Sequence, residues 1–126
     1  MSRKFPNLFF TGYTQSGIAA NVVVMFQQQG SHIAHVIAEA RKRGAVTIEP
    51  TQAAQDGWVR TIRETAVDMG PFQRECTPGF YNNEGVRNPN QPSYLGEPYG
   101  PGFFAFEQVL QDWRDEGNLA GLELGR

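Results

Sequence analysis

The order of apolar and polar residues in the first third of the chain predicts a strand and a long helix. Asn7 to Thr11 is a short apolar run rich in phenylalanine, bounded by Pro6 and Gly12, which is typical of a buried strand. From Ser16 to Arg43 apolar residues recur at steps of three and four, and Gly44 follows as a stop. We therefore expect a strand, a tight glycine turn and a helix capped by Ser16.

Two further helices are predicted downstream. One follows Thr51, a suitable N-cap, and extends to about Met69. The other runs from about Gly102 to Glu116, with aromatic residues on one side and Gly117 as its stop. The tail from Leu119 to Leu124 could add one extended segment.

The stretch from Gly70 to Gly102 has a different composition. It contains six of the eight prolines, together with glycines and asparagines, so repetitive regular structure is not expected. Its aromatic residues give it anchors for packing, which favours an ordered loop over a disordered one. A loop of this length is usually functional.

A lone strand cannot satisfy its backbone or bury both faces, so the strand at Asn7 to Thr11 must join a sheet. No other convincing strand lies near it in the sequence. We therefore interpret residues 1–126 as one fragment, the last piece of a larger α/β protein. Within it, residues 1–44 form strand, turn and helix, 45–69 the second helix, 70–102 the loop, and 103–126 the terminal helix and tail.

Charge and composition exclude several functions. The net charge of −2 gives no electrostatic reason to expect nucleic acid, and Arg41 to Arg43 suit the end of a helix better than a phosphate site. Cys76 is the only cysteine, so no internal disulfide can form. His32 and His35 lack a third metal ligand. No apolar stretch approaches the length of a bilayer span, and no signal-peptide pattern is present. We expect a soluble, cytoplasmic protein without a metal or membrane partner.

The glycine turn, residues 12–17, carries the clearest candidate chemistry. A strand that ends in glycine and leads into a helix presents free backbone N–H groups and the positive end of the helix dipole. In open α/β sheets, ligands bind beside the carboxyl ends of strands. Such a site suits the electron-rich edge of a flavin or another anionic group. A plain strand-to-helix connection explains the same residues equally well.

Two segments together resemble a known family. They are Phe5-Pro-Asn-Leu-Phe-Phe-Thr-Gly12 and Glu75-Cys-Thr-Pro-Gly-Phe-Tyr-Asn-Asn-Glu-Gly85. With the long helix between them, they look like the C-terminal part of flavin-dependent Baeyer–Villiger monooxygenases, relatives of cyclohexanone and phenylacetone monooxygenase. The resemblance covers nearly the whole chain. In the later segment many members carry a tryptophan, a tyrosine and a Gly-Ala-Asn-x-Pro-Gly run, from which this sequence departs.

The resemblance implies a fold and cofactors. The fold class would be α/β, the C-terminal fragment of a flavoprotein with two dinucleotide-binding domains, with one short strand, two to three helices and a long ordered loop. FAD and NADP would serve the intact enzyme. The implied cofactor-binding residues come from the glycine turn and from the loop, and none is catalytic: Gly12, Tyr13, Thr14, Gln15, Ser16, Gly17, Tyr81, Asn82 and Asn83.

The intact enzyme implied by this resemblance uses NADPH and oxygen to insert an oxygen atom next to a ketone carbonyl, giving an ester or lactone. The Gly-x-Gly-x-x-Gly fingerprints and the Phe-x-Gly-x-x-x-His-x-x-x-Trp-Pro signature are absent here, so we expect this chain alone to be inactive and to bind neither cofactor tightly. A different hypothesis is a non-enzymatic segment that docks onto a separately encoded flavin-binding chain. A third is a small independent helical interaction protein.

Overall fold

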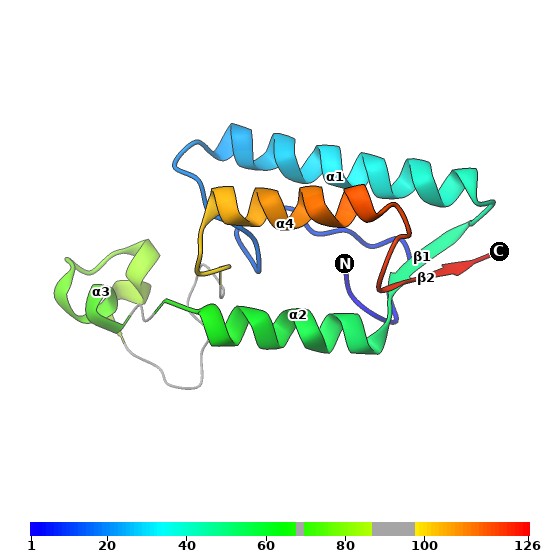
Figure 1. Ribbon diagram of the computed structural model, residues 1–126. Coiled ribbons are helices and arrows are strands. Elements are labelled where there is room, and N and C mark those ends of the chain that lie inside the picture. Colours follow the sequence, from blue (N-terminus) through cyan, green and yellow to red (C-terminus); the bar gives the residue numbers. More distant parts are fainter. Residues whose placement is uncertain (68–69, 87–97) are drawn as a thin grey trace.

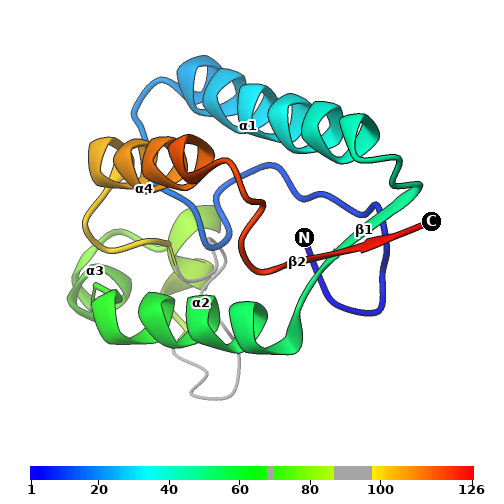
Figure 2. The same ribbon diagram turned by 45° about the vertical axis from the view of Figure 1, so that its right-hand side comes forward.

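The computed structural model describes residues 1–67, 70–86 and 98–126 (Figure 1). Two long helices, α1 (Val22–Lys42) and α4 (Phe103–Glu116), lie side by side and run in the same direction. The helix α2 (Gln52–Thr65) lies opposite them and runs the other way. The first twenty residues pass between these two layers as a chain without regular structure, which Figure 2 shows from a second direction.

One small sheet closes the end of this arrangement. Strand β1 (Thr47–Pro50) pairs antiparallel with β2 (Leu122–Gly125), so that Ile48 faces Leu124 and Pro50 faces Leu122. The expected extended segment in the tail is therefore confirmed, whereas β1 lies within residues 45–69, where only the second helix was predicted. Strand β1 has four residues and ends in proline, and its partner is more than seventy positions away. A segment of four residues is too short to show the alternation of apolar and polar residues by which a strand is predicted.

Residues 7–11, predicted as a strand, are not one in the structure. Asn7 has a φ of +62°, which turns the chain, and its side chain takes the place of a strand partner along β1. Its backbone N–H donates to the Ile48 carbonyl oxygen at 2.9 Å, and its Oδ1 accepts from the Ile48 N–H at 3.0 Å. Asparagine tolerates this backbone region, and its amide mimics a peptide group.

The first helix begins five residues later than predicted. Asn21, not Ser16, is the N-cap of α1, and its Oδ1 accepts from the N–H groups of Val23 and Val24. Ser16 is not a cap because the residues directly after it are not helical, and its hydroxyl instead donates to the Gly12 carbonyl oxygen at 2.7 Å. The predicted end is confirmed, since Gly44 has a φ of +71° directly after the helix. The basic cluster occupies the last turn as expected.

The other helices follow the sequence pattern closely. Thr51 caps α2 through a hydrogen bond from the Ala54 N–H at 3.1 Å, as predicted. The predicted end near Met69 is wrong, because α2 ends at Thr65 and the backbone of Ala66 is extended, with a ψ of 136°. Gly117, with a φ of +66°, ends α4 as predicted. The stretch 70–102 is less irregular than expected, because it contains the short helices α3 (Gly70–Glu75) and η1 (Phe80–Gly85).

The core lies where α1, α4 and the sheet meet. Val36 and Ala40 of α1 pack with Ile48 and Leu119, and Trp113 of α4 packs against this cluster. Met25 and Ile62 are fully buried elsewhere in the helical layers. A two-stranded sheet alone is marginally stable, so we expect the burial of these side chains to contribute most of the stability. No helix within the described residues is both long and apolar enough to span a membrane.

Candidate functional site

A hollow of about 840 Å³ lies between the helical layers, and the N-terminal segment runs along its wall. Its lining is mainly apolar and comes from α1, α2, α4 and the N-terminal segment, with Ile33, Trp58, Phe106 and Trp113 among the larger contributors. The glycine turn contributes Gly12, Thr14, Gln15 and Ser16 to this lining. Ligand sites commonly combine an apolar wall with a few polar groups of this kind.

The glycine turn is held from one side by Gln29 of α1. The Gln29 Oε1 accepts from the Gly12 N–H at 2.8 Å, and its Nε2 donates to the Gly12 carbonyl oxygen at 2.8 Å. The same Nε2 lies 3.3 Å from the Ser16 Oγ. Gly12 has a φ of +128°, a region that favours glycine, while a Cβ there would have open space. The conformation, not crowding, explains this glycine.

Three other elements contact the turn. The Trp58 Nε1–H of α2 donates to the Gln15 carbonyl oxygen at 3.3 Å, and the Tyr99 N–H donates to the Ser16 carbonyl oxygen at 3.0 Å. Trp58 and Tyr99 also stack, with ring centroids 5.5 Å apart. Gly17 packs directly under α4, where a Cβ would lie 2.7 Å from the Phe103 Cα. The turn is thus fixed by four separate parts of the chain.

The prediction that the glycine turn lies at a helix N-terminus is wrong, because α1 starts at Val22. The turn therefore offers backbone groups without a helix dipole behind them. Within residues 1–67, 70–86 and 98–126, the structure shows no hydrogen bond from the backbone N–H groups of residues 13–17. Of these residues, Thr14, Gln15 and Ser16 line the hollow, where the turn can present its N–H groups to a ligand or to further protein.

His32 lies on the same side of α1 as Gln29 and lines the hollow. Its ring is 5.2 Å from that of Trp113, and the Arg114 Nη1 lies 3.4 Å from its Nδ1. Because a guanidinium can only donate, Nδ1 accepts and carries no proton. Burial, together with the nearby charges of Arg114 and His35, lowers the pKa of His32 from 6.5 to about 4. The rings of His32 and His35 both pack against Trp113, and the described residues contain no cluster suited to a metal.

This lowered pKa predicts a pH-dependent stability. Unfolded His32 takes up a proton near pH 6.5, whereas folded His32 does so only near pH 4, so the free energy of unfolding should fall as pH drops through that window. The His32→Asn variant lacks the titrating group and should show a flatter profile. Urea unfolding at several pH values checks this, and equal slopes for both proteins would contradict it.

Of the loop residues in the predicted site, Asn82 is described, and its side chain makes its hydrogen bonds within the loop. Asn82 is buried, and its amide donates to the carbonyl oxygens of Cys76 and Thr77 and accepts from the Gly79 N–H. Its side chain thus shapes its own loop, and Asn82 is absent from the described lining of the hollow. Tyr81 and Asn83 lie in η1, but their side chains are outside the described part of the structure. Cofactor contact by these three residues stays a prediction.

Sequence reasoning missed Gln29, Trp58 and Tyr99 as partners of the turn. A signal for Gln29 was present, because it falls at helical spacing among the buried residues Met25, Val36 and Ala40. A glutamine on the apolar face of a helix must find hydrogen-bond partners when buried. Trp58 and Tyr99 carried no comparable signal, since aromatic residues at helical spacing usually indicate only core packing.

The chain is similar along nearly its whole length to Baeyer–Villiger and other FAD-binding monooxygenases, so the resemblance to the C-terminal part of this family is confirmed. It is 38% identical over 120 residues to pentalenolactone D synthase of Streptomyces exfoliatus, and 41% identical over 115 residues to a Baeyer–Villiger monooxygenase of Streptomyces coelicolor. These alignments cover 95% and 91% of this chain. No model of a protein family matches it.

Solved structures give the same result for the fold. The polycyclic ketone monooxygenase of Thermothelomyces thermophila matches 98% of this chain with a TM-score of 0.78 and 32% identity. Cyclohexanone monooxygenase of Rhodococcus sp. Phi1, solved with NADP+, matches with a TM-score of 0.74 at 23% identity, which supports the fold alone. The chain spans about a fifth of the length of these relatives, 20% for the first and 22% for the second.

Proposed function

We propose that this chain acts as the C-terminal portion of an NADPH- and FAD-dependent monooxygenase that inserts an oxygen atom next to a ketone carbonyl. The observation that carries the proposal is the similarity of 38–41% identity over more than nine-tenths of the chain. A related FAD-binding monooxygenase of Hypomyces subiculosus, 35% identical over 119 residues, supports FAD as cofactor. The NADP-bound cyclohexanone and steroid monooxygenases support NADP. A ketone and oxygen are the proposed substrates, and the cytoplasm the proposed location.

The glycine turn fits the role of bordering a flavin. Its backbone N–H groups at residues 13–17, which have no hydrogen-bond partner within the described chain, suit the electron-rich edge of the ring. Bound flavin would supply the oxygen chemistry, and the protein would position it and exclude water. The apolar wall next to the turn, which includes Phe106 and Trp113, would exclude water from that side.

This proposal predicts that the isolated 126-residue chain does not oxidise NADPH. The glycine turn alone offers few contacts to a flavin. The chain also has no Gly-x-Gly-x-x-Gly motif to bind the pyrophosphate of either cofactor. The check is the absorbance decay of NADPH with purified chain, added FAD and a cyclic ketone. A rate above that of free FAD would contradict the proposal, and a known monooxygenase run in parallel is the positive control.

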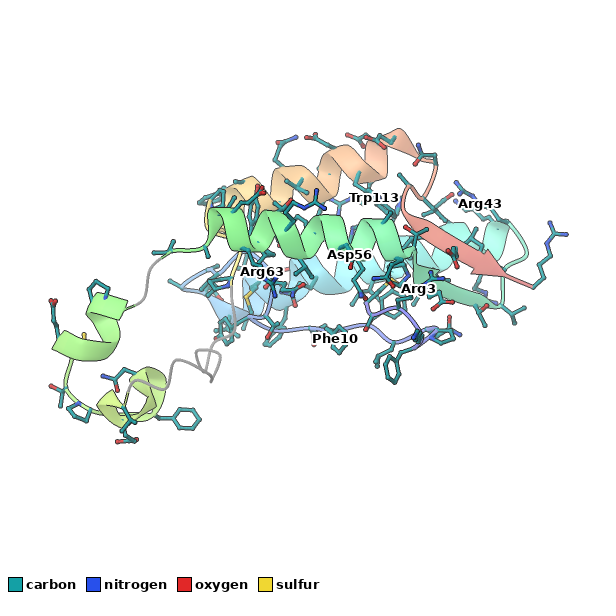
Figure 3. All side chains as sticks on the ribbon, turned by 90° about the horizontal axis from the view of Figure 1, so that it is seen from below. Arg3, Phe10, Arg43, Asp56, Arg63 and Trp113 are labelled. Carbon is teal, nitrogen blue, oxygen red and sulfur yellow. The ribbon has the colours of Figure 1, made fainter. Side chains whose placement is uncertain are left out.

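A second candidate function is a non-enzymatic segment that docks onto a separately encoded flavin-binding polypeptide. The observation in its favour is the apolar surface of the N-terminal segment, where Phe5, Leu8 and Phe10 are 58%, 41% and 57% exposed. Figure 3 shows Phe10 pointing away from the rest of the chain. Such a surface marks an interaction site. Co-purification with a flavin-containing chain would support this function, and a partner-free monomer would count against it.

A further inference from the structure

We infer that Gln29 is a positioning residue that sets the conformation of the glycine turn, and through it the orientation of the flavin. The inference rests on the proposed function, in which this turn borders the ring. Gln29 is itself no ligand in this account. It acts through the peptide groups of Gly12 and through the Ser16 hydroxyl.

The Gln29 side chain forms two hydrogen bonds with the backbone of a single residue, Gly12. Its carboxamide bonds both the N–H and the carbonyl oxygen of Gly12, each at 2.8 Å, as a neighbouring strand would. The Ser16 hydroxyl closes the network by donating to the same Gly12 oxygen at 2.7 Å. Gly12 and Ser16 are therefore both held in place, and they determine the path of the three residues between them. Their backbone groups are the ones that would face the ring.

Because the network is buried, it depends on the ability of one atom, the Gln29 Nε2, to donate hydrogen bonds. Gln29 is only 7% exposed and Ser16 6%, so water cannot easily replace a lost partner. The Nε2 must donate to two oxygens, which a carboxylate cannot do. The Gln29→Glu substitution keeps the shape and the acceptor, but it sets a carboxylate oxygen against the Gly12 carbonyl oxygen.

The neighbouring glutamines supply the control. Gln27 is exposed on the same helix and makes no bond to the glycine turn, so Gln27→Glu adds the same charge two residues away. The side-chain amide atoms of Gln28 are buried but have no partner within the described residues, so Gln28 does not share the function of Gln29. Of the three consecutive glutamines, Gln29 is the one whose side chain is hydrogen-bonded to the turn in the described part of the chain.

The test titrates FAD into the polypeptide that contains this chain, as wild type, Gln29→Glu and Gln27→Glu. The readouts are the Kd for FAD, the visible flavin spectrum and its pH dependence. We expect Gln29→Glu to weaken FAD binding by roughly tenfold or more and to shift the spectrum, because it loses a buried donor. Lowering the pH protonates the new carboxyl, whose pKa burial raises, and should return the spectrum toward wild type.

Each outcome has a distinct meaning. A shifted spectrum and weakened FAD binding in Gln29→Glu, recovered at low pH and not seen in Gln27→Glu, would support the inference. A wild-type protein that binds FAD, together with a Gln29→Glu variant that behaves like Gln27→Glu, would overturn it and leave the proposed function intact. A wild-type protein that binds no FAD would overturn the proposed function, and the inference with it.

Discussion

Replacing Gly17 with alanine is expected to lower the free energy of unfolding by about 1–3 kcal/mol, the usual range for overpacking a filled interior. A Cβ at this position would lie 2.7 Å from both the Phe103 Cα and the Phe106 Cβ, and 3.0 Å from the Gly102 carbonyl oxygen. Two of these atoms belong to the backbone, so a rotamer change cannot relieve the clash. The start of α4 would have to move away from the glycine turn.

A matched glycine substitution separates this packing effect from backbone entropy. Gly57 lies inside α2, and a Cβ there meets no atom within 4 Å. Gly57→Ala should therefore raise the free energy of unfolding by up to about 1 kcal/mol, because alanine favours the helix. Urea unfolding followed by far-UV circular dichroism measures both variants. If Gly17→Ala were as stable as wild type, the tight contact between the turn and α4 would be refuted.

Truncating Met25 to alanine should cost about 2–5 kcal/mol, as other large-to-small changes at buried sites do. Met25 is fully buried on the inner face of α1, four residues before Gln29. Its removal leaves a cavity beside the helix face that holds the turn. The loss of packing should therefore loosen the turn as well as the helix.

Val23 on the same helix provides the control, since it is 73% exposed. Val23→Ala removes an exposed side chain and should change the free energy of unfolding by no more than about 0.5 kcal/mol. The same urea titration compares the two variants. Equal effects of Met25→Ala and Val23→Ala would mean that α1 does not bury the face that the structure assigns to it.

Local signals in the sequence predicted the helices well. Thr51, Gly44 and Gly117 each end or begin a helix through chemistry that one residue supplies, by a side-chain cap or a left-handed backbone. The strand prediction for Asn7 to Thr11 was wrong because the structure of this segment depends on a contact that is distant in the sequence. Its phenylalanines are typical of a strand, but Asn7 directs its amide at β1 instead, and no local pattern reveals such a contact across forty residues.

The sequence predicted the turn at residues 12–17 but not the contacts that hold it. The sequence located the glycine turn, yet it took Ser16 as a helix cap, whereas the hydroxyl bonds Gly12. The turn is held by hydrogen bonds to Gln29, Trp58 and Tyr99. The most distant of these, Tyr99, lies more than eighty residues from the turn in the sequence. Tertiary contacts of this range are set by packing and not by local periodicity. Only the buried glutamine gave a hint of them.

The most direct test of the account is to sequence the DNA upstream of the Met1 codon and read it in frame. The account predicts an open frame that encodes two Gly-x-Gly-x-x-Gly turns, which would cradle the pyrophosphates of FAD and NADP. Such a frame would join this chain to a polypeptide of the length that its relatives, about five times as long, have. A stop codon directly before Met1, with no flavin-binding reading frame beside it, would contradict the account.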